Sequence, residues 1–199
     1  MFSFKDALKY SYEPHLLGFC GPVEDCSKIL LDYINGKSKD KKKVKELLEK
    51  FDAVYIYCQK IAEKNKITDP LSTKVLEAYW LGNDLLKKFK KNPPHHSYHV
   101  FHIGSITGRI EIKGKLLDIC RVSWGEVIRF NKNNVWVKYQ PVVLKPERHL
   151  GKLRIKKIKR GFLDKIKEGD MVSWHWNRGC QVLNQKQVKN LEYYTLKNL

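Results

Sequence analysis

The feature that most restricts the fold of this chain is the pair Pro93-Pro94, which separates two segments of different hydrophobic periodicity. Before it, apolar residues recur every three or four positions, the spacing of amphipathic helices. After it, from about Gly104, short runs of β-branched and aromatic residues alternate with turn residues, which is typical of strands. Because proline cannot continue a helix, we place a boundary here. The sequence predicts a helical domain (1–92), a His-rich linker (93–104) and a strand-rich domain (105–199).

The first half of the chain is expected to be built from helices. Ser3 and Asp6 resemble a capping pair that opens a first helix, which we expect to run through Tyr10 and to be stopped by Pro14. A longer apolar stripe further along follows helical spacing and includes Cys58. We therefore assign Cys58 to the core.

The second half is expected to form strands and one last helix. Asn184 and Gln187 resemble a capping box for a helix that begins at about Gln185. The fold class is therefore α+β: an N-terminal helical domain followed by a small five-stranded OB-like β-barrel with a C-terminal helix. Six segments are candidates for the strands: 106–112, 116–122, 125–130, 135–139, 153–160 and 171–176.

The chain is strongly basic. Lysine and arginine total 39 against 21 aspartates and glutamates, which gives a net charge of +18. Nucleic acid, an acidic protein partner or an anionic surface would each suit this charge, and so would lysines spread over solvated helix faces. The residues that we single out for contact with a partner or with nucleic acid are Lys152, Arg154, Lys156, Lys157, Lys159 and Arg160.

The number of cysteines and the hydropathy of the chain indicate its expected cellular location. Five cysteines, an odd number in 199 residues, do not suggest a disulfide framework, so we expect a reduced, cytoplasmic setting. The chain begins with charged and polar residues rather than a signal peptide. No window approaches the roughly 18 consecutive apolar residues of a membrane span.

Two residues of metal-binding type lie on expected strands, Cys120 in the segment 118–128 and His175 in the segment 169–175. A thiolate and a neutral imidazole are ligands that soft and borderline transition metals prefer. If the two strands are neighbours in the barrel, the two side chains should converge at one barrel rim. The alternative is that both residues simply belong to the core.

A second candidate is the segment 95–102, which holds four of the seven histidines. His95 and His99 would share one face of a helix, and Cys20 is the obvious cysteine to join them. Without a Cys-x-x-Cys partner, however, the segment more often has a structural role. We therefore rank Cys20, His95 and His99 below Cys120 and His175 as metal ligands.

The residues around Cys120 and His175 carry a family resemblance. Cys120 precedes Gly125 and a valine-rich strand, and Gly169-Asp-Met-Val-Ser-Trp-His precedes the last helix. In order and spacing this half resembles the hydrogenase maturation chaperones of the HypC/HupF type, which are small barrels with a C-terminal helix. In that family the cysteine lies next to the initiator methionine and is followed by a proline. Here a helical half precedes Cys120, and Trp124 stands in the place of the proline.

The resemblance implies a function. In those chaperones the cysteine, helped by the histidine, holds iron with cyanide and carbon monoxide ligands during assembly of the nickel-iron hydrogenase site. By this resemblance Cys120 and His175 would hold or transfer such an iron centre. The implied partners are a hydrogenase precursor or a second maturation protein, either of them acidic enough to dock on the basic surface.

The whole chain also resembles an uncharacterised prokaryotic family. The motifs that carry this second resemblance are Leu17-Gly-Phe-Cys-Gly-Pro, Glu77-Ala-Tyr-Trp-Leu-Gly-Asn and His95-His-Ser-Tyr-His. No established activity follows from it.

Three functions are therefore compared. The first is a non-enzymatic metallocentre assembly or carrier protein, and the second is a basic OB-like nucleic-acid-binding protein with aromatics that could stack on bases. An enzyme ranks last, because no phosphate-binding loop, nucleophile elbow or HExxH motif is present. The aromatics considered for stacking are Trp136, Tyr139, Trp174 and Trp176.

Overall fold

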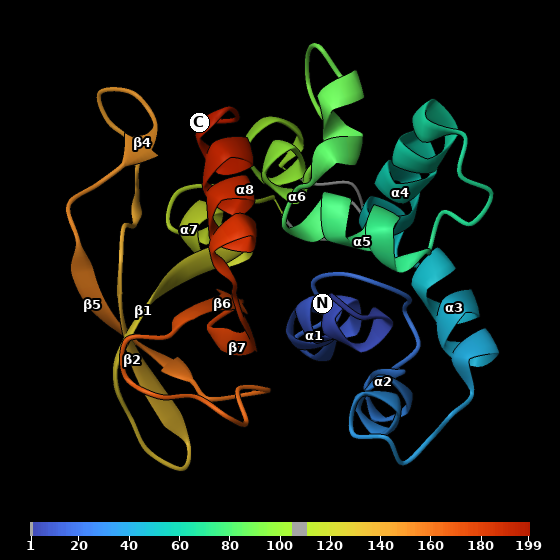
Figure 1. Ribbon diagram of the computed structural model, residues 1–199, viewed down its shortest axis with the longest axis horizontal. Coiled ribbons are helices and arrows are strands. Elements are labelled where there is room, and N and C mark those ends of the chain that lie inside the picture. Colours follow the sequence, from blue (N-terminus) through green and yellow to red (C-terminus); the bar gives the residue numbers. More distant parts are fainter. Residues whose placement is uncertain (1, 105–110) are drawn as a thin grey trace.

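The computed structural model describes residues 2–104 and 111–199, and it is an α+β protein as predicted. Helices form the N-terminal part, five strands close a barrel, and a helix ends the chain. In Figure 1 the barrel and the helices lie side by side, with α1 and α8 between them. The first helices are α1 (Phe4–Leu16), α2 (Ser27–Ile34), α3 (Lys41–Glu49), α4 (Asp52–Asn65), α5 (Thr73–Trp80) and the 3-10 helix η1 (Asp84–Lys88).

The rest of the chain agrees with the expected elements only in part, because helical turns precede the barrel and the strands at 142–143, 149–150 and 178–182 were not expected. The His-rich segment forms the short helix α6 (His96–Tyr98) and a π-helical turn, η2 (His99–Ile103), and α7 (Leu116–Cys120) follows. The barrel strands are β1 (Ser123–Phe130), β2 (Asn134–Tyr139), β5 (Arg154–Lys159), β6 (Met171–His175) and β7 (Arg178–Val182). The pair β3 (Val142–Val143) and β4 (His149–Leu150) forms a separate small sheet, and α8 spans Gln185–Leu196.

The first helix is longer than the sequence indicated. Ser3 and Asp6 form the predicted capping box, but α1 continues past Tyr10 to Leu16 with Pro14 inside it. Pro14 lies in the last turn, where it removes one backbone hydrogen bond and leaves the carbonyl of Tyr10 without its helical donor. The expected end of this helix was therefore wrong.

The strand expected over residues 116–122 is also wrong, because residues 116–120 form α7 and the strand begins only at Ser123. The Asp118 carboxylate accepts hydrogen bonds from the Val142 amide at 2.9 Å and the Tyr139 hydroxyl at 3.0 Å. It also pairs with Arg121 at 3.1 Å. These contacts with distant residues fold the segment into a helical turn against the barrel. Most of the strand expected over 106–112 lies outside the described residues, and Glu111 and Ile112 are not in a strand.

The barrel strands follow the order β1-β2-β5-β7-β6 and return to β1. All neighbours are antiparallel except β5 and β7, which meet in parallel at Lys159 and Arg178. Alternate residues of the strands point inward, as period-two patterning requires. The barrel interior is filled by Val127, Val135, Val137, Tyr139, Ile158, Leu163, Val172 and Trp174.

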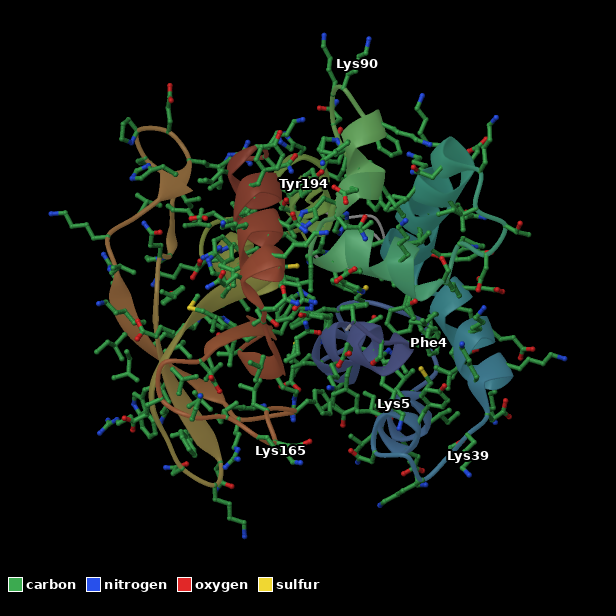
Figure 2. The ribbon with its side chains drawn as sticks, in the orientation of Figure 1. Phe4, Lys5, Lys39, Lys90, Lys165 and Tyr194 are labelled. Atoms are coloured by element: carbon green, nitrogen blue, oxygen red, sulfur yellow. The ribbon has the colours of Figure 1, made fainter. Side chains whose placement is uncertain are left out.

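The helical part and the strand-rich part share one hydrophobic core. The largest buried cluster joins residues of α1, α4 and α5 to Cys180 of β7 and to Leu191 and Tyr194 of α8. Tyr194 is labelled in Figure 2, and its hydroxyl donates to the Asn83 carbonyl at 3.3 Å. Gly82, at φ +83°, lets this ring approach so closely that a Cβ there would lie 2.2 Å from it. The core is therefore continuous across residues 93–104.

A buried carboxylate also joins the helical part to the barrel through ion pairs. Glu13 of α1 is 1% exposed. It accepts a hydrogen bond from Lys159 Nζ at 2.8 Å and another from Arg178 Nε. These are the two residues at which β5 meets β7. Since an unpaired buried carboxylate would be costly, the ion pairs fix α1 to the place where the barrel closes.

Candidate metal centre

Three side chains that can bind a metal converge between the barrel and the helices. Ligand atoms of His96 (α6), Cys120 (α7) and His175 (β6) all lie within 4.8 Å of one another, and all three residues are buried. They line a cavity of about 40 Å³ together with residues of α1 and α5. Cys120 and His175 thus lie close together, as expected, but under the helices rather than at an open barrel rim.

The orientation of His175 follows from the proline in α1. His175 Nδ1 lies 2.6 Å from the Tyr10 carbonyl oxygen, the group that Pro14 leaves without a helical donor. Because a carbonyl only accepts, Nδ1 carries the proton and Nε2 carries the lone pair. Nε2 is buried and makes no hydrogen bond of normal geometry, although the Cys120 carbonyl lies near the ring. A histidine held by a carbonyl on one nitrogen, with the other directed at an ion, is the usual arrangement of a metal ligand.

His96 is held on both nitrogens. Its Nε2 donates to the Cys120 carbonyl at 2.9 Å, so Nδ1 accepts from the Tyr79 hydroxyl at 3.0 Å. An ion at Nδ1 would displace the Tyr79 hydroxyl and keep the carbonyl contact. The His96 ring stands edge-on to the His175 ring, with centroids 4.9 Å apart, so the two rings border the same space.

Cys120 is the last residue of α7 and is 5% exposed. Burial, and next the neighbouring Cys20, raise the pKa of its thiol. The thiol is therefore protonated without a metal, and an ion would have to displace that proton on binding.

Above Cys120 lies the hairpin turn between β6 and β7. Its residues Trp176 and Asn177 have φ values of +50° and +61°. Two positive φ values in succession suit a tight hairpin but cost free energy for residues other than glycine. The Trp176 amide donates to the Ile119 carbonyl at 3.1 Å, and its indole ring stacks on Phe19 at 4.4 Å. The strained turn thus places an aromatic wall over the cavity.

Burial keeps the histidines of this region neutral. It lowers the pKa of His175 to about 4, that of His99 to about 4 and that of His95 to about 3. It also lowers the pKa of His96 well below its usual value, and the neighbouring His175 adds to this. Neutral imidazoles keep the lone pair that a metal requires.

These pKa values predict acid sensitivity of the metal-free protein. The unfolded chain takes up protons at histidine near pH 6.5, whereas the folded chain does so only near pH 4 or below. Stability is therefore fully present above pH 6.5 and is lost as the pH falls toward 4. We expect the free energy of unfolding, measured in urea, to fall by more than about 1.4 kcal/mol per pH unit between pH 6 and pH 5. A flat profile over this range would contradict neutral burial of these histidines.

The other predicted ligands have different surroundings. His95 caps α6, accepting from the Ser97 amide at 3.2 Å, and stacks on Tyr194 at 5.5 Å, so it serves packing. His99 and Cys20 both line the cavity, although neither belongs to the three-residue cluster. His96, which sequence reasoning passed over, takes the place expected of His95.

The choice of His95 and His99 assumed a helix that includes His95 among its helical residues. Because the His95 side chain caps the helix instead, the first helical histidine is His96. The run of four histidines was the only sequence signal that pointed to it. The turn that follows is π-helical, a conformation that is frequent at functional sites.

The basic residues singled out in the sequence do not form one uniform patch. Lys159 pairs with Glu13, and Arg160 donates to the carbonyls of Leu163 and Asp164. Lys156 lies over the Tyr139 ring at 5.3 Å. The remaining three, Lys152, Arg154 and Lys157, are exposed.

Basic side chains also lie on segments outside the barrel strands. Figure 2 shows Lys39, Lys90 and Lys165 at the outside of the molecule on three separate segments. Of the four aromatics considered for base stacking, Tyr139, Trp174 and Trp176 are buried. Trp136 is half-buried beneath Arg129, whose guanidinium lies 4.2 Å from the ring. Most of the basic and aromatic side chains proposed for a nucleic-acid interface are therefore buried or already in contact with other residues of the protein.

Fold and site define an α+β protein with a buried group of two imidazoles and one thiol. By sequence the chain belongs to the DUF6390 family, a family of unknown function whose model matches residues 5–92 and 87–199. No curated protein and no solved structure was found to match the chain. Among the described residues, no helix is both long and apolar enough to cross a membrane.

Proposed function

We propose that this protein binds one transition-metal ion through His96, Cys120 and His175. The observation that carries the proposal is the cluster of three buried metal-binding side chains, in which the Tyr10 carbonyl orients the ring of His175. A buried nitrogen without a hydrogen bond of normal geometry, such as His175 Nε2, costs free energy, and an ion would lower that cost. The thiol and the second imidazole stand within reach of the same point.

The dimensions suit a small ion. Metal–nitrogen distances of about 2.0–2.1 Å and metal–sulfur distances of about 2.3 Å put the ligand atoms of a tetrahedral site about 3.3–3.8 Å apart. The three ligand atoms here lie within 4.8 Å of one another, so a contraction of about 1 Å would close the site. Imidazole and thiolate together favour zinc, iron, cobalt or nickel over magnesium or calcium.

The finer proposal is that the ion is iron and that the protein is a metallocentre assembly or carrier protein related to the HypC/HupF chaperones. Its support is the resemblance around Cys120 and His175, together with the closeness of the two side chains. Exposed Lys152, Arg154 and Lys157 would dock an acidic partner such as a hydrogenase precursor. A carrier must also release its ion, and burial of the site means that release requires a movement of the covering residues.

Metal analysis tests the first proposal. Protein purified without oxygen and dialysed separately against Zn²⁺, Fe²⁺ and Co²⁺ should retain about one equivalent per chain after gel filtration. Retention of none of the three ions would overturn metal binding.

Infrared spectroscopy tests the carrier proposal. The protein is produced together with the hydrogenase maturation machinery, and cyanide and carbon monoxide stretching bands should then accompany the bound iron. Metal without those bands would remove the carrier role and leave metal binding intact.

A further inference from the structure

We propose that Cys20 is the fourth ligand of this site and that the loop of residues 17–25 closes over the bound ion. The inference rests on the proposed function and adds to it a complete coordination sphere. Its starting observation is that Cys20 lines the same cavity as His96, Cys120 and His175, although it comes from a loop far from them in sequence.

The backbone of Cys20 is held from both sides. Its amide donates to the Pro14 carbonyl at 3.3 Å. His15 Nε2 accepts from the Cys26 amide at 3.0 Å, so His15 Nδ1 carries the proton and donates to the Cys20 carbonyl at 3.2 Å. The loop thus turns back at the end of α1, beside the proline that sets the orientation of His175.

The residues next to Cys20 restrict the loop further. Gly21 has φ +94°, and a Cβ there would lie 2.6 Å from the Phe51 ring, so only glycine fits. Phe19 stacks on Trp176, which belongs to the turn above Cys120. The position of Cys20 is therefore fixed by contacts with α1, with Phe51 and with the β6–β7 turn.

Charge is the strongest argument for a second thiolate. Among the residues that the structure describes, none that lines the cavity is Asp, Glu, Lys or Arg. A divalent ion held by two neutral imidazoles and one thiolate would leave a net charge of +1 in this apolar space, which is unfavourable. A second thiolate brings the charge to zero. Cys20 is the other cysteine on the cavity wall.

Cys20 and Cys120 both line this one cavity. Two thiolates facing one apolar cavity would repel each other without an ion, and an ion between them would replace that repulsion by attraction to both. The resulting Cys₂His₂ set is the closed, four-coordinate type that holds an ion rather than presenting it to a substrate.

The loop also supplies the route by which the ion enters. Cys20 is half-buried, whereas His96, Cys120 and His175 are buried. An ion approaching from solvent therefore meets Cys20 first, and its release requires the loop to lift Cys20 and Phe19 away from the cavity.

Cobalt spectroscopy tests the proposal on the full chain. Co²⁺ bound to thiolates gives charge-transfer absorption that grows with the number of sulfurs, and tetrahedral Co²⁺ gives intense visible bands. For Cys20→Ser we expect about half of the wild-type charge-transfer absorbance. We also expect at least roughly tenfold faster release of Co²⁺ to a chelator.

The matched control is Cys26→Ser. Cys26 belongs to the segment that follows the loop, but its sulfur lies 3.1 Å from His15 Nε2, a contact that serine can keep, and it does not line the cavity. Its spectrum and its release rate should match the wild type. An unchanged Cys20→Ser spectrum on a protein that binds Co²⁺ would overturn the role of Cys20 alone. Absence of Co²⁺ binding by the wild type would overturn the proposed function as well.

Discussion

Replacement of Cys120 by alanine is expected to weaken metal binding by more than about 100-fold. Loss of a residue that merely orients a ligand already costs about 10–100-fold, and Cys120 is proposed to contact the ion directly. In the metal-free protein the same change removes one buried sulfur and should cost only about 1 kcal/mol of unfolding free energy. Competition with a coloured chelator gives the affinity, and urea denaturation gives the stability.

Cys58→Ala is the matched control for this experiment. Cys58 is fully buried in α4, and it does not line the cavity. Its loss should lower stability by a similar amount while metal affinity stays at the wild-type value. Equal metal affinity of the Cys120 and Cys58 variants would show that Cys120 is a core residue and no ligand, which was the alternative reading of the sequence.

The second large effect is expected at Gly82. Alanine there must adopt a left-handed backbone conformation, which costs about 1–2 kcal/mol, and its Cβ would meet the Tyr194 ring at 2.2 Å. Overpacking of this kind adds about 1–3 kcal/mol. We expect Gly82→Ala to destabilise the protein by about 2–5 kcal/mol, seen as a lower urea midpoint at unchanged slope.

Gly169→Ala measures the backbone part of this effect, so the difference between the two variants gives the steric part. Gly169 has nearly the same backbone angle, φ +85° against +83°, but a Cβ there would meet nothing within 4 Å. It should therefore cost only the backbone term of about 1–2 kcal/mol. If both variants lose the same stability, the Tyr194 ring of α8 does not pack against Gly82 as closely as described.

The fold class was predictable because hydrophobic periodicity is a local property. Helices α1 to α5 lie before Pro93-Pro94, and all strands of the described residues lie after it. The error at residues 116–122 has a nonlocal cause, since α7 depends on the bonds of Asp118 to Tyr139 and to the Val142 amide. A propensity for strands was overridden there by contacts more than 20 residues away.

The candidate site was predictable only in part, for similar reasons. Residue type and spacing pointed to Cys120 and His175, which do lie together. His96 could not be chosen over His95 without the knowledge that the His95 side chain caps the helix. Burial of the site could not be foreseen either, because the residues that cover it come from α1 and from the loop after it.

Pro14 lowers the stability of α1 and at the same time leaves the Tyr10 carbonyl open to His175. Proline inside a helix costs up to about 3 kcal/mol relative to alanine. A selection for melting temperature alone would therefore favour alanine at this position. The amide of that alanine would compete for the Tyr10 carbonyl, and the hydrogen bond that keeps the His175 proton on Nδ1 would weaken. The more stable protein would then be the one with the less ordered ligand.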